Sequence, residues 1–154
     1  MWNDHPRYYY FKILEEFKDR IIIELAGHDH LESLRTHKID NDNYFHNLLV
    51  APSITPWYNN NPGVSSLTID GDLVARNLKS TYLNLAPTIG PISATPFDEL
   101  EFRELDFAKQ FGIKDLSAES IYKFALRLAG DEKLHKEYLI RKMGFYPSIP
   151  AEAA

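Results

Sequence analysis

Two histidines, at positions 28 and 30, are the residues whose type and spacing best suit chemistry in this chain. They stand in the sequence Gly27-His28-Asp29-His30, directly after the apolar run that ends at Ala26. Glycine permits a tight turn, and a tight turn would let both imidazole rings enter one pocket. Neutral imidazole is a good ligand for zinc, iron or manganese-type ions. The pair therefore predicts a metal site, with two unrelated loop residues as the alternative.

The other candidate residues give no converging pattern. Four further histidines are expected to be solvated or at the surface, because nothing around them supplies more ligands: His5, His37, His46 and His135. Asp29 could orient a ligand or stabilise its loop, and we expect the second role. Cysteine is absent, which excludes disulfides, thiolate nucleophiles and zinc sites built on sulfur. Serine nucleophile motifs, glycine-rich phosphate loops and EF-hand spacing are absent as well.

Composition indicates a folded domain or a piece of one. The 154 residues are 44% hydrophobic, 13% aromatic and 25% charged, which excludes disorder and collagen-like repeats. A formal charge of −5 disfavours a nucleic-acid polymer as partner. No apolar run reaches the roughly 18 residues of a membrane span, and we expect no signal peptide at the start of this sequence.

The histidine pair must be positioned by the elements of the first half. Apolar residues three and four apart predict a helix over 7–20, and the β-branched run at 21–26 predicts a largely buried strand. Gly27 then opens a loop at the carboxyl end of that strand, where α/β sheets usually hold ligands. Further strands are expected at 31–38 and 47–51, separated by a polar turn at 39–43.

A loop rich in proline and asparagine follows at 52–63, and it carries Trp57 and Tyr58. These two aromatic residues either pack and hold the loop or face a ligand. The residues Asp70-Gly71-Asp72 lie between two strand-like runs, 64–69 and 73–85, and predict a β-hairpin.

The C-terminal part is expected to be helical. Three helices are predicted, over 97–111, 118–129 and 132–143. Ser117 and Asp131 suit helix N-caps, and three glycines suit left-handed positions at helix ends: Gly112, Gly130 and Gly144. We expect the tail at 147–154 to be frayed.

Several motifs in order along the chain carry a resemblance to a known family. Gly27-His28-Asp29-His30 after a hydrophobic strand resembles the last Gly-His-x-His motif of calcineurin-like metallophosphoesterases. Later segments are similar to those of the acid sphingomyelinase-like phosphodiesterases: Ala51-Pro52-Ser53-Ile54-Thr55 with Trp57, Asn61-Pro62-Gly63, Thr68-Ile69-Asp70, 81–85, and Tyr122 with 127–131. The resemblance covers nearly the whole chain.

The resemblance implies an α/β fold with a specific organisation. Residues 1–90 would form the C-terminal half of a metallophosphoesterase-type β-sandwich flanked by helices. Residues 91–146 would form the helical C-terminal subdomain, and 147–154 the tail. Asn61-Pro62-Gly63 would be a structural turn.

The resemblance also implies a site with two divalent metal ions, commonly zinc, which activate a hydroxide that attacks phosphorus. His28 would bind one ion and His30 the other. Trp57 would lie near the substrate headgroup, where a cation–π contact with choline suits an indole, or it would be a packed loop anchor. The substrate would be a phosphodiester in a phospholipid such as sphingomyelin, or in a nucleotide, with contact to a membrane surface and a secreted or lysosomal location.

The sequence lacks several motifs that the family contains. The Asp-x-His motif, the bridging aspartate and the Asn-His motif of the family would all lie before Met1. The family's C-terminal cysteines, and its glycosylation acceptor near Asn84, are missing as well. We therefore expect no catalytic residue in this chain, no activity of the chain alone, and the upstream half of the phosphoesterase domain as its partner. The alternative is a non-catalytic remnant that binds lipid or protein.

Overall fold

The structure is a computed structural model that describes residues 4–38, 45–58, 60–85 and 96–144. The described residues form two three-stranded sheets, four α-helices and a short 3-10 helix at Phe97–Glu99. The α/β class expected from the sequence is therefore confirmed. No helix in these ranges is long and apolar enough to cross a membrane.

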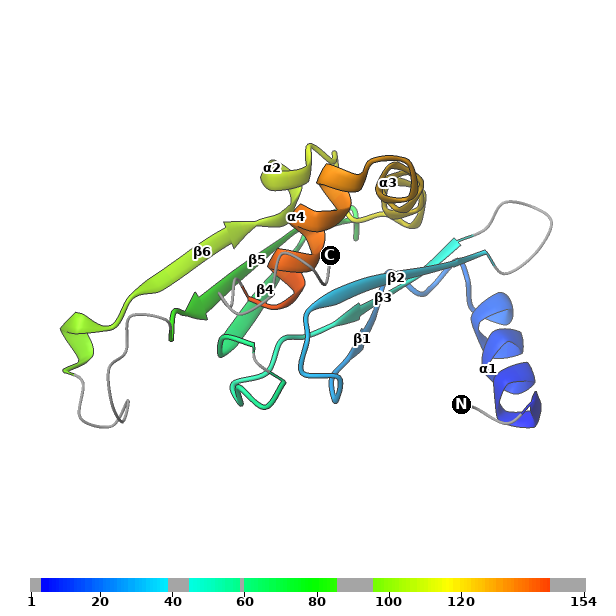
Figure 1. Ribbon diagram of the computed structural model, residues 1–154. Coiled ribbons are helices and arrows are strands. Elements are labelled where there is room, and N and C mark those ends of the chain that lie inside the picture. Colours follow the sequence, from blue (N-terminus) through cyan, green and yellow to red (C-terminus); the bar gives the residue numbers. More distant parts are fainter. Residues whose placement is uncertain (1–3, 39–44, 59, 86–95, 145–154) are drawn as a thin grey trace.

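The first sheet combines parallel and antiparallel pairing. Helix α1 (Asp4–Glu16) precedes strands β1 (Glu24–Ala26), β2 (Ser33–Lys38) and β3 (Phe45–Val50). The spatial order is β1-β3-β2, with β1 parallel and β2 antiparallel to the central β3 (Figure 1). Because β1 and β3 are parallel, their carboxyl ends lie at the same end of the sheet. The loop that carries the two histidines begins there.

Two expectations for this region are corrected. The helix begins and ends earlier than predicted, and only the last three residues of 21–26 pair as a strand. The predicted burial of that strand is wrong, because Leu25 keeps 63% of its surface exposed. The physical reason is that β1 is an edge strand among the described strands, with a neighbour on one side only. The predicted turn at 39–43 lies outside the described residues.

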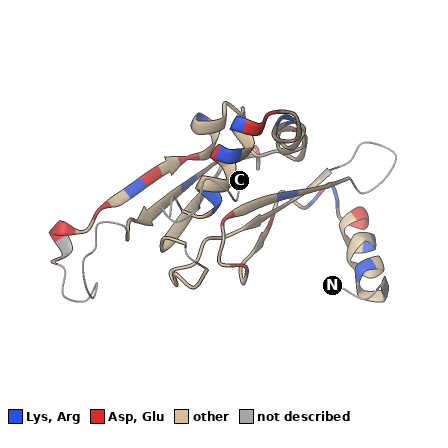
Figure 2. Cartoon of the chain, in the orientation of Figure 1, with Lys and Arg blue, Asp and Glu red and all other residues tan. Residues whose placement is uncertain are grey.

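The predicted hairpin is confirmed, and its two strands belong to the second sheet. Strands β4 (Gly63–Ile69) and β5 (Ala75–Leu83) pair antiparallel, and β6 (Phe102–Asp106) adds to β5. The Asp70 carboxylate holds the turn, because its Oδ1 accepts hydrogen bonds from the backbone N–H of Asp72 and Val74 at 3.0 and 2.9 Å. The outer strand β6 carries charges of both signs, as Figure 2 shows.

The predicted helix over 97–111 is wrong. Residues 102–106 form β6, and within 97–111 only Phe107–Phe111 form an α-helix, α2, while Phe97–Glu99 form the 3-10 helix. Asp106 explains the boundary, because its side chain accepts a hydrogen bond from the backbone N–H of Lys109 and caps the helix there. The residues before this cap pair along β5 instead, from Phe102 opposite Leu83 to Asp106 opposite Lys79.

The last two helices agree with the sequence, with one exception. Ser117 caps α3 (Ala118–Gly130), and Asp131 caps α4 (Glu132–Lys142). Gly112 and Gly144 have the predicted left-handed φ, at 60° and 61°. Gly130 does not, because it still belongs to α3 and the extended Asp131 ends this helix while it caps the next.

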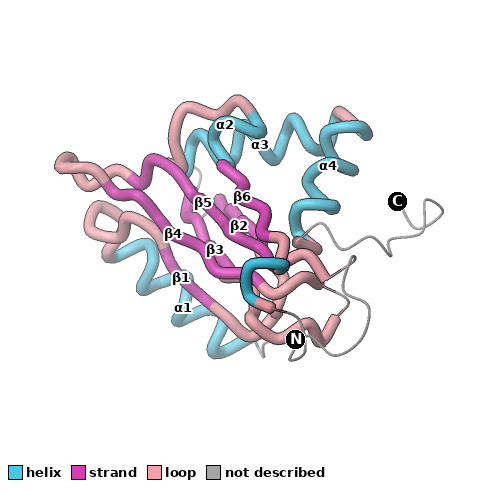
Figure 3. Tube along the Cα trace, turned by 90° about the vertical axis from the view of Figure 1, so that its left-hand side faces the viewer, coloured by secondary structure: helices cyan, strands magenta, loops and turns pink. Residues whose placement is uncertain are grey.

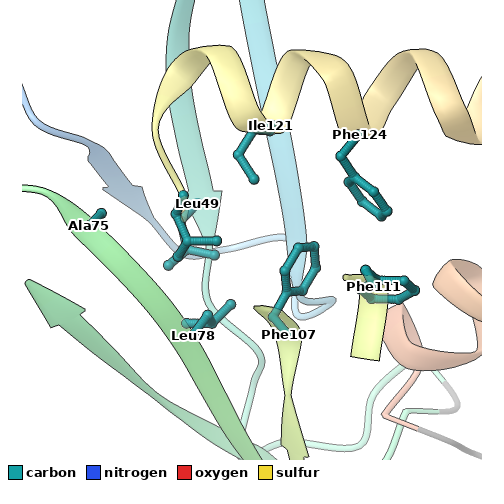
Figure 4. Close-up of a cluster of buried hydrophobic side chains, with 8 residues drawn as sticks. Leu49, Ala75, Leu78, Phe107, Phe111, Ile121 and Phe124 are labelled. Carbon is teal, nitrogen blue, oxygen red and sulfur yellow. The ribbon is translucent and has the colours of Figure 1, made fainter. Parts of the chain in front are cut away.

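The hydrophobic core is shared between the sheets and the C-terminal helices. Helices α2, α3 and α4 gather on one side of the strands, away from α1 (Figures 1 and 3). In the centre, the rings of Phe107, Phe111 and Phe124 lie with centroids 4.8 to 5.4 Å apart, against Leu49 and Leu78 (Figure 4). The expected boundary at 90/91 and the tail lie outside the described residues, so the division into 1–90 and 91–146 stays a prediction.

Candidate metal-binding site

The two histidines lie in a turn of unusual backbone conformation. His28 has φ 79° and His30 has φ 62°, both in the left-handed region that is uncommon for residues other than glycine. Gly27, expected to make the turn, does not have a positive φ. The histidines themselves therefore bend the chain, at a cost of roughly 1–2 kcal/mol each. Such conformations persist where the surroundings impose them, and they cluster at functional sites.

The loop 27–31 begins at a fixed point. Ala26 pairs with Val50 of the parallel strand β3, and the carbonyl of Ala26 also accepts a hydrogen bond from the backbone N–H of Ala51 at 2.8 Å. The following loop packs on the same turn, because the backbone N–H of Ser53 donates to the carbonyl of His30 at 3.2 Å. The histidine turn thus lies at the carboxyl ends of the two parallel strands β1 and β3, with residues 27–29 exposed.

His30 has the environment of a ligand more than that of a surface residue. It is half-buried, and its Nδ1 atom is buried with no hydrogen-bond partner in the described part of the chain. Its ring meets the ring of Tyr58 edge to face, with centroids 5.5 Å apart. A buried imidazole nitrogen without a partner is costly, and such atoms call for an explanation that a bound ligand can supply.

His28 is exposed, and Asp29 between the two histidines stabilises the loop. The Asp29 carboxylate forms an ion pair with the Arg35 guanidinium of β2. This contact agrees with the loop-stabilising role expected from the sequence. Both partners are close to half exposed, so the pair contributes at most about 1 kcal/mol.

Within the described residues, the two histidines would make up only part of a metal site. The chemistry of two imidazoles fits a zinc-like ion, and the unpartnered Nδ1 of His30 is consistent with this fit. No group of three or more His, Cys, Asp or Glu within the described ranges could hold an ion. Any further ligands would therefore have to come from residues outside these ranges.

Two of the remaining histidines contradict the surface positions expected for them. His46 is buried on β3, where its Nε2 lies 2.9 Å from Glu24 Oε2. The Tyr10 hydroxyl donates to the same carboxylate oxygen at 2.5 Å, and burial, followed by this bond, raises the pKa of Tyr10. His37 is half-buried beside the ring of Phe11, and burial lowers the pKa of His37. These contacts join α1 to the first sheet, while His5 and His135 are exposed as expected.

The proline-rich loop brings an aromatic residue to the histidines, although Trp57 is not the one in contact. Trp57 is 74% exposed, which does not fit a packed loop anchor. Tyr58 lies against His30, and sequence reasoning named it only together with Trp57. A pattern of two adjacent aromatic residues gives no means to decide which of them meets the neighbouring loop.

Asn61 has the structural role expected of the Asn61-Pro62-Gly63 turn. Its buried side chain donates to the carbonyl of Gly144 at 2.7 Å and accepts from the backbone N–H of Leu85 at 3.0 Å. Gly63, in the same turn, lies close to the Tyr82 ring, and an added Cβ atom would lie only 2.5 Å from Tyr82 Cδ1. This turn therefore ties the loop 52–62 to the end of α4 and to β5.

A buried ion pair at the far end of the histidine loop was not foreseen from the sequence. The Glu32 and Arg141 side chains are 3% and 1% exposed, and Arg141 Nε donates to Glu32 Oε1 at 2.8 Å. Ser65 and Ser80 donate to the other carboxylate oxygen of Glu32. Arg141 also donates to the side chains of Gln110 and Ser80, at 3.0 and 3.1 Å. Both charges are therefore surrounded by hydrogen-bonding partners, as burial requires.

Comparison with known proteins gives one similarity relevant to this site. No family model matches the chain. A curated human protein, acid sphingomyelinase-like phosphodiesterase 3b, is 24% identical to this chain over an alignment of 155 residues, and the alignment covers 94% of this chain. The chain spans about a third of that relative's length, since the match covers 33% of it. Over nearly all of its own length, this chain is therefore distantly similar to one third of a protein named as a phosphodiesterase.

Proposed function

We propose that this chain is the C-terminal part of a metal-dependent phosphodiesterase and supplies two imidazole ligands to its active site. The observation that carries the proposal is the turn in which His28 and His30 both adopt left-handed backbone conformations, at the carboxyl end of β1. The motif resemblance and the name of the human relative support the same class of reaction.

The residues of this chain would act by holding and orienting ligands. His28 would bind one divalent ion and His30 the other, with zinc as the expected metal. When bound, such a pair of ions stabilises the attacking and leaving oxygens at phosphorus and lowers the pKa of a bound water. Tyr58 would fix the orientation of the His30 ring through its edge-to-face contact. In this proposal the residues of the chain hold the ions and none acts as a catalytic group, so we expect no activity of the chain alone.

Substrate binding is assigned to Trp57. This indole is exposed on the loop that packs on the histidine turn, so it is free to meet a ligand. A cation–π contact with a choline headgroup suits it, and a phosphodiester in a phospholipid such as sphingomyelin is the proposed substrate. The proposal also includes contact with a membrane surface and a secreted or lysosomal location, both of which the resemblance implies.

The proposed partner is the upstream half of a phosphoesterase domain, and the free edge of β1 is where it would join. Leu25 is exposed on this strand, and Ile22 just before it is exposed as well. The outer strand β6 is different, because it carries exposed charged residues such as Arg103 and Glu104. Charged residues on an edge strand oppose pairing with another chain, whereas exposed apolar residues such as Leu25 favour it. A strand parallel to β1 would bring its own ligands to the histidine turn.

Zinc titration of the purified chain tests the proposal. We expect weak zinc binding that moves the NMR signals of His28 and His30, and loss of binding in the variant His28→Ala with His30→Ala. The matched control is His135→Ala, which changes an exposed histidine on α4 and should bind zinc as the original chain does. We expect no hydrolysis of sphingomyelin or of a chromogenic phosphodiester. Hydrolysis of either substrate by the 154-residue chain, with loss of this activity in the double variant, would contradict the prediction that the metal site of this chain is incomplete.

A second candidate function is supported by the apolar residues near β1. Ile13, Phe17, Ile22 and Leu25 are exposed on α1, β1 and the segment between them. These residues also suit a non-catalytic module that binds a protein or a lipid surface. The sequence encoded upstream of Met1 separates the two functions: Asp-x-His and Asn-His motifs there favour the enzyme, and a chain that starts at Met1 favours the module. Absence of liposome binding, with or without zinc, would contradict the lipid-binding form of the module.

A further inference from the structure

The buried ion pair of Glu32 and Arg141 is not explained by the proposed function, and one of its members, Glu32, lies next to the histidine turn in the sequence. We infer that this ion pair is a positioning device for His28 and His30, an inference that rests on the proposed metal site. Glu32 follows His30 by two residues, so the place of its carboxylate determines where the histidine turn ends.

Glu32 is held by side chains from three elements, and a fourth element holds its partner Arg141. Arg141 of α4 donates to one carboxylate oxygen, and Ser65 of β4 and Ser80 of β5 donate to the other. Gln110 of α2 accepts from the same guanidinium, at 3.0 Å. The guanidinium also lies over the ring of Phe107, with its carbon 5.0 Å from the ring centroid. Movement of Glu32 would therefore leave a buried arginine without its charge partner, which is strongly unfavourable.

The histidine turn is thus a short segment between two fixed points. At its start, Ala26 is bonded to β3 and to Ala51; at its end, Glu32 is bonded to Arg141 of α4 and to the two serines of the hairpin. Only the residues 27–31 connect these points. Two left-handed residues within so short a span shorten the connection, and the fixed ends impose this conformation despite its cost. Arg141 therefore acts on the imidazole pair through Glu32, without contact to the site itself.

The test replaces the pair by apolar residues of similar size, Glu32→Leu with Arg141→Met, because such replacements often preserve stability. The matched control is Glu119→Leu with Lys123→Met, which removes an exposed ion pair on α3. Two quantities are measured on each folded chain: the NMR scalar couplings and Cα shifts that report the φ of His28 and His30, and the zinc affinity. We expect the buried variant to lose the left-handed signals and at least tenfold in zinc affinity, and the control to match the original chain.

Unchanged histidine couplings and zinc affinity in the folded buried variant would overturn the inference. If that variant does not fold, Glu32→Gln decides, because it keeps the shape and removes the charge; we expect at least a threefold loss of zinc affinity and reduced left-handed signals, and unchanged values overturn the inference. If the original chain binds no zinc, the proposed metal site fails, while the histidine couplings still decide whether the pair sets the turn.

Discussion

Replacement of His28 by glycine should stabilise the chain while it removes a proposed metal ligand. His28 has φ 79° and an exposed side chain, and it has no hydrogen bond or ion pair in the described part of the structure. Glycine adopts this conformation without the clash between Cβ and the following carbonyl. The substitution therefore relieves backbone strain and removes no favourable contact that would offset the gain.

The expected gain is small and can be worked out from two opposing effects. Relief of the left-handed conformation contributes about 1–2 kcal/mol. Glycine costs about 0.5–1 kcal/mol relative to alanine, because it loses more backbone entropy on folding. The net increase in the free energy of unfolding lies between about 0 and about 1.5 kcal/mol, with a midpoint of about 0.75 kcal/mol, or about 1.5–3 °C in Tm for a chain of this size.

Urea unfolding measures this change as a shift in the urea concentration at the midpoint of unfolding, while the slope of the free energy of unfolding against urea concentration stays constant. His28→Ala is the matched comparison, because alanine keeps the Cβ atom and should leave stability nearly unchanged. Leu73→Gly is a second comparison, since Leu73 has φ 59° in the hairpin turn and lies outside the candidate site. It should be stabilised similarly and keep its zinc affinity. If His28→Gly proves no more stable than His28→Ala, the strain attributed to this turn is absent.

Three further predictions concern residues around the site and the core. Burial lowers the pKa of His37 below its ordinary 6.5, so the folded state favours the neutral ring. The stabilisation from the neutral ring should thus be complete above that value and decrease as pH falls toward the folded pKa. Urea unfolding should therefore give a difference in the free energy of unfolding between about pH 7.5 and about pH 5.5 that is smaller in His37→Gln than in the original chain. Gly144→Ala should lose about 2–4 kcal/mol by the same measurement, because its φ is 61° and an added Cβ atom would lie 2.5 Å from Tyr82. Phe124→Ala should lose about 3–5 kcal/mol, since it removes a ring from the centre of the core, and a loss below 1 kcal/mol would contradict that packing.

Local signals in the sequence predicted local structure well. The Asp70-Gly71 pair marked the hairpin, and Ser117 and Asp131 marked the starts of two helices. In each case the hydrogen bonds join residues two to four positions apart, so the residue types alone carry the information. The loop after β1 was also predicted from its position behind an apolar run.

Features that depend on distant partners could not be predicted in the same way. Residues 102–106 were interpreted as helix because nothing near them indicates that β5 is their neighbour. Leu25 was expected to be buried, since a run of apolar residues does not reveal which strand lies at an edge. The left-handed turn at His28 and His30 depends on the positions of both loop ends. Glu32 and Arg141 are buried together, and no local pattern in the sequence indicates a pairing over 109 residues.

The separation of Glu32 and Arg141 by 109 residues affects how the protein is made. A ribosome adds roughly 5–20 residues per second, so the arginine emerges roughly 5–20 s after the glutamate. Throughout that interval the carboxylate stays hydrated and the first sheet cannot complete its contacts. We therefore expect nascent chains that stop before α4 to be digested rapidly by protease, and full-length chains to resist once released.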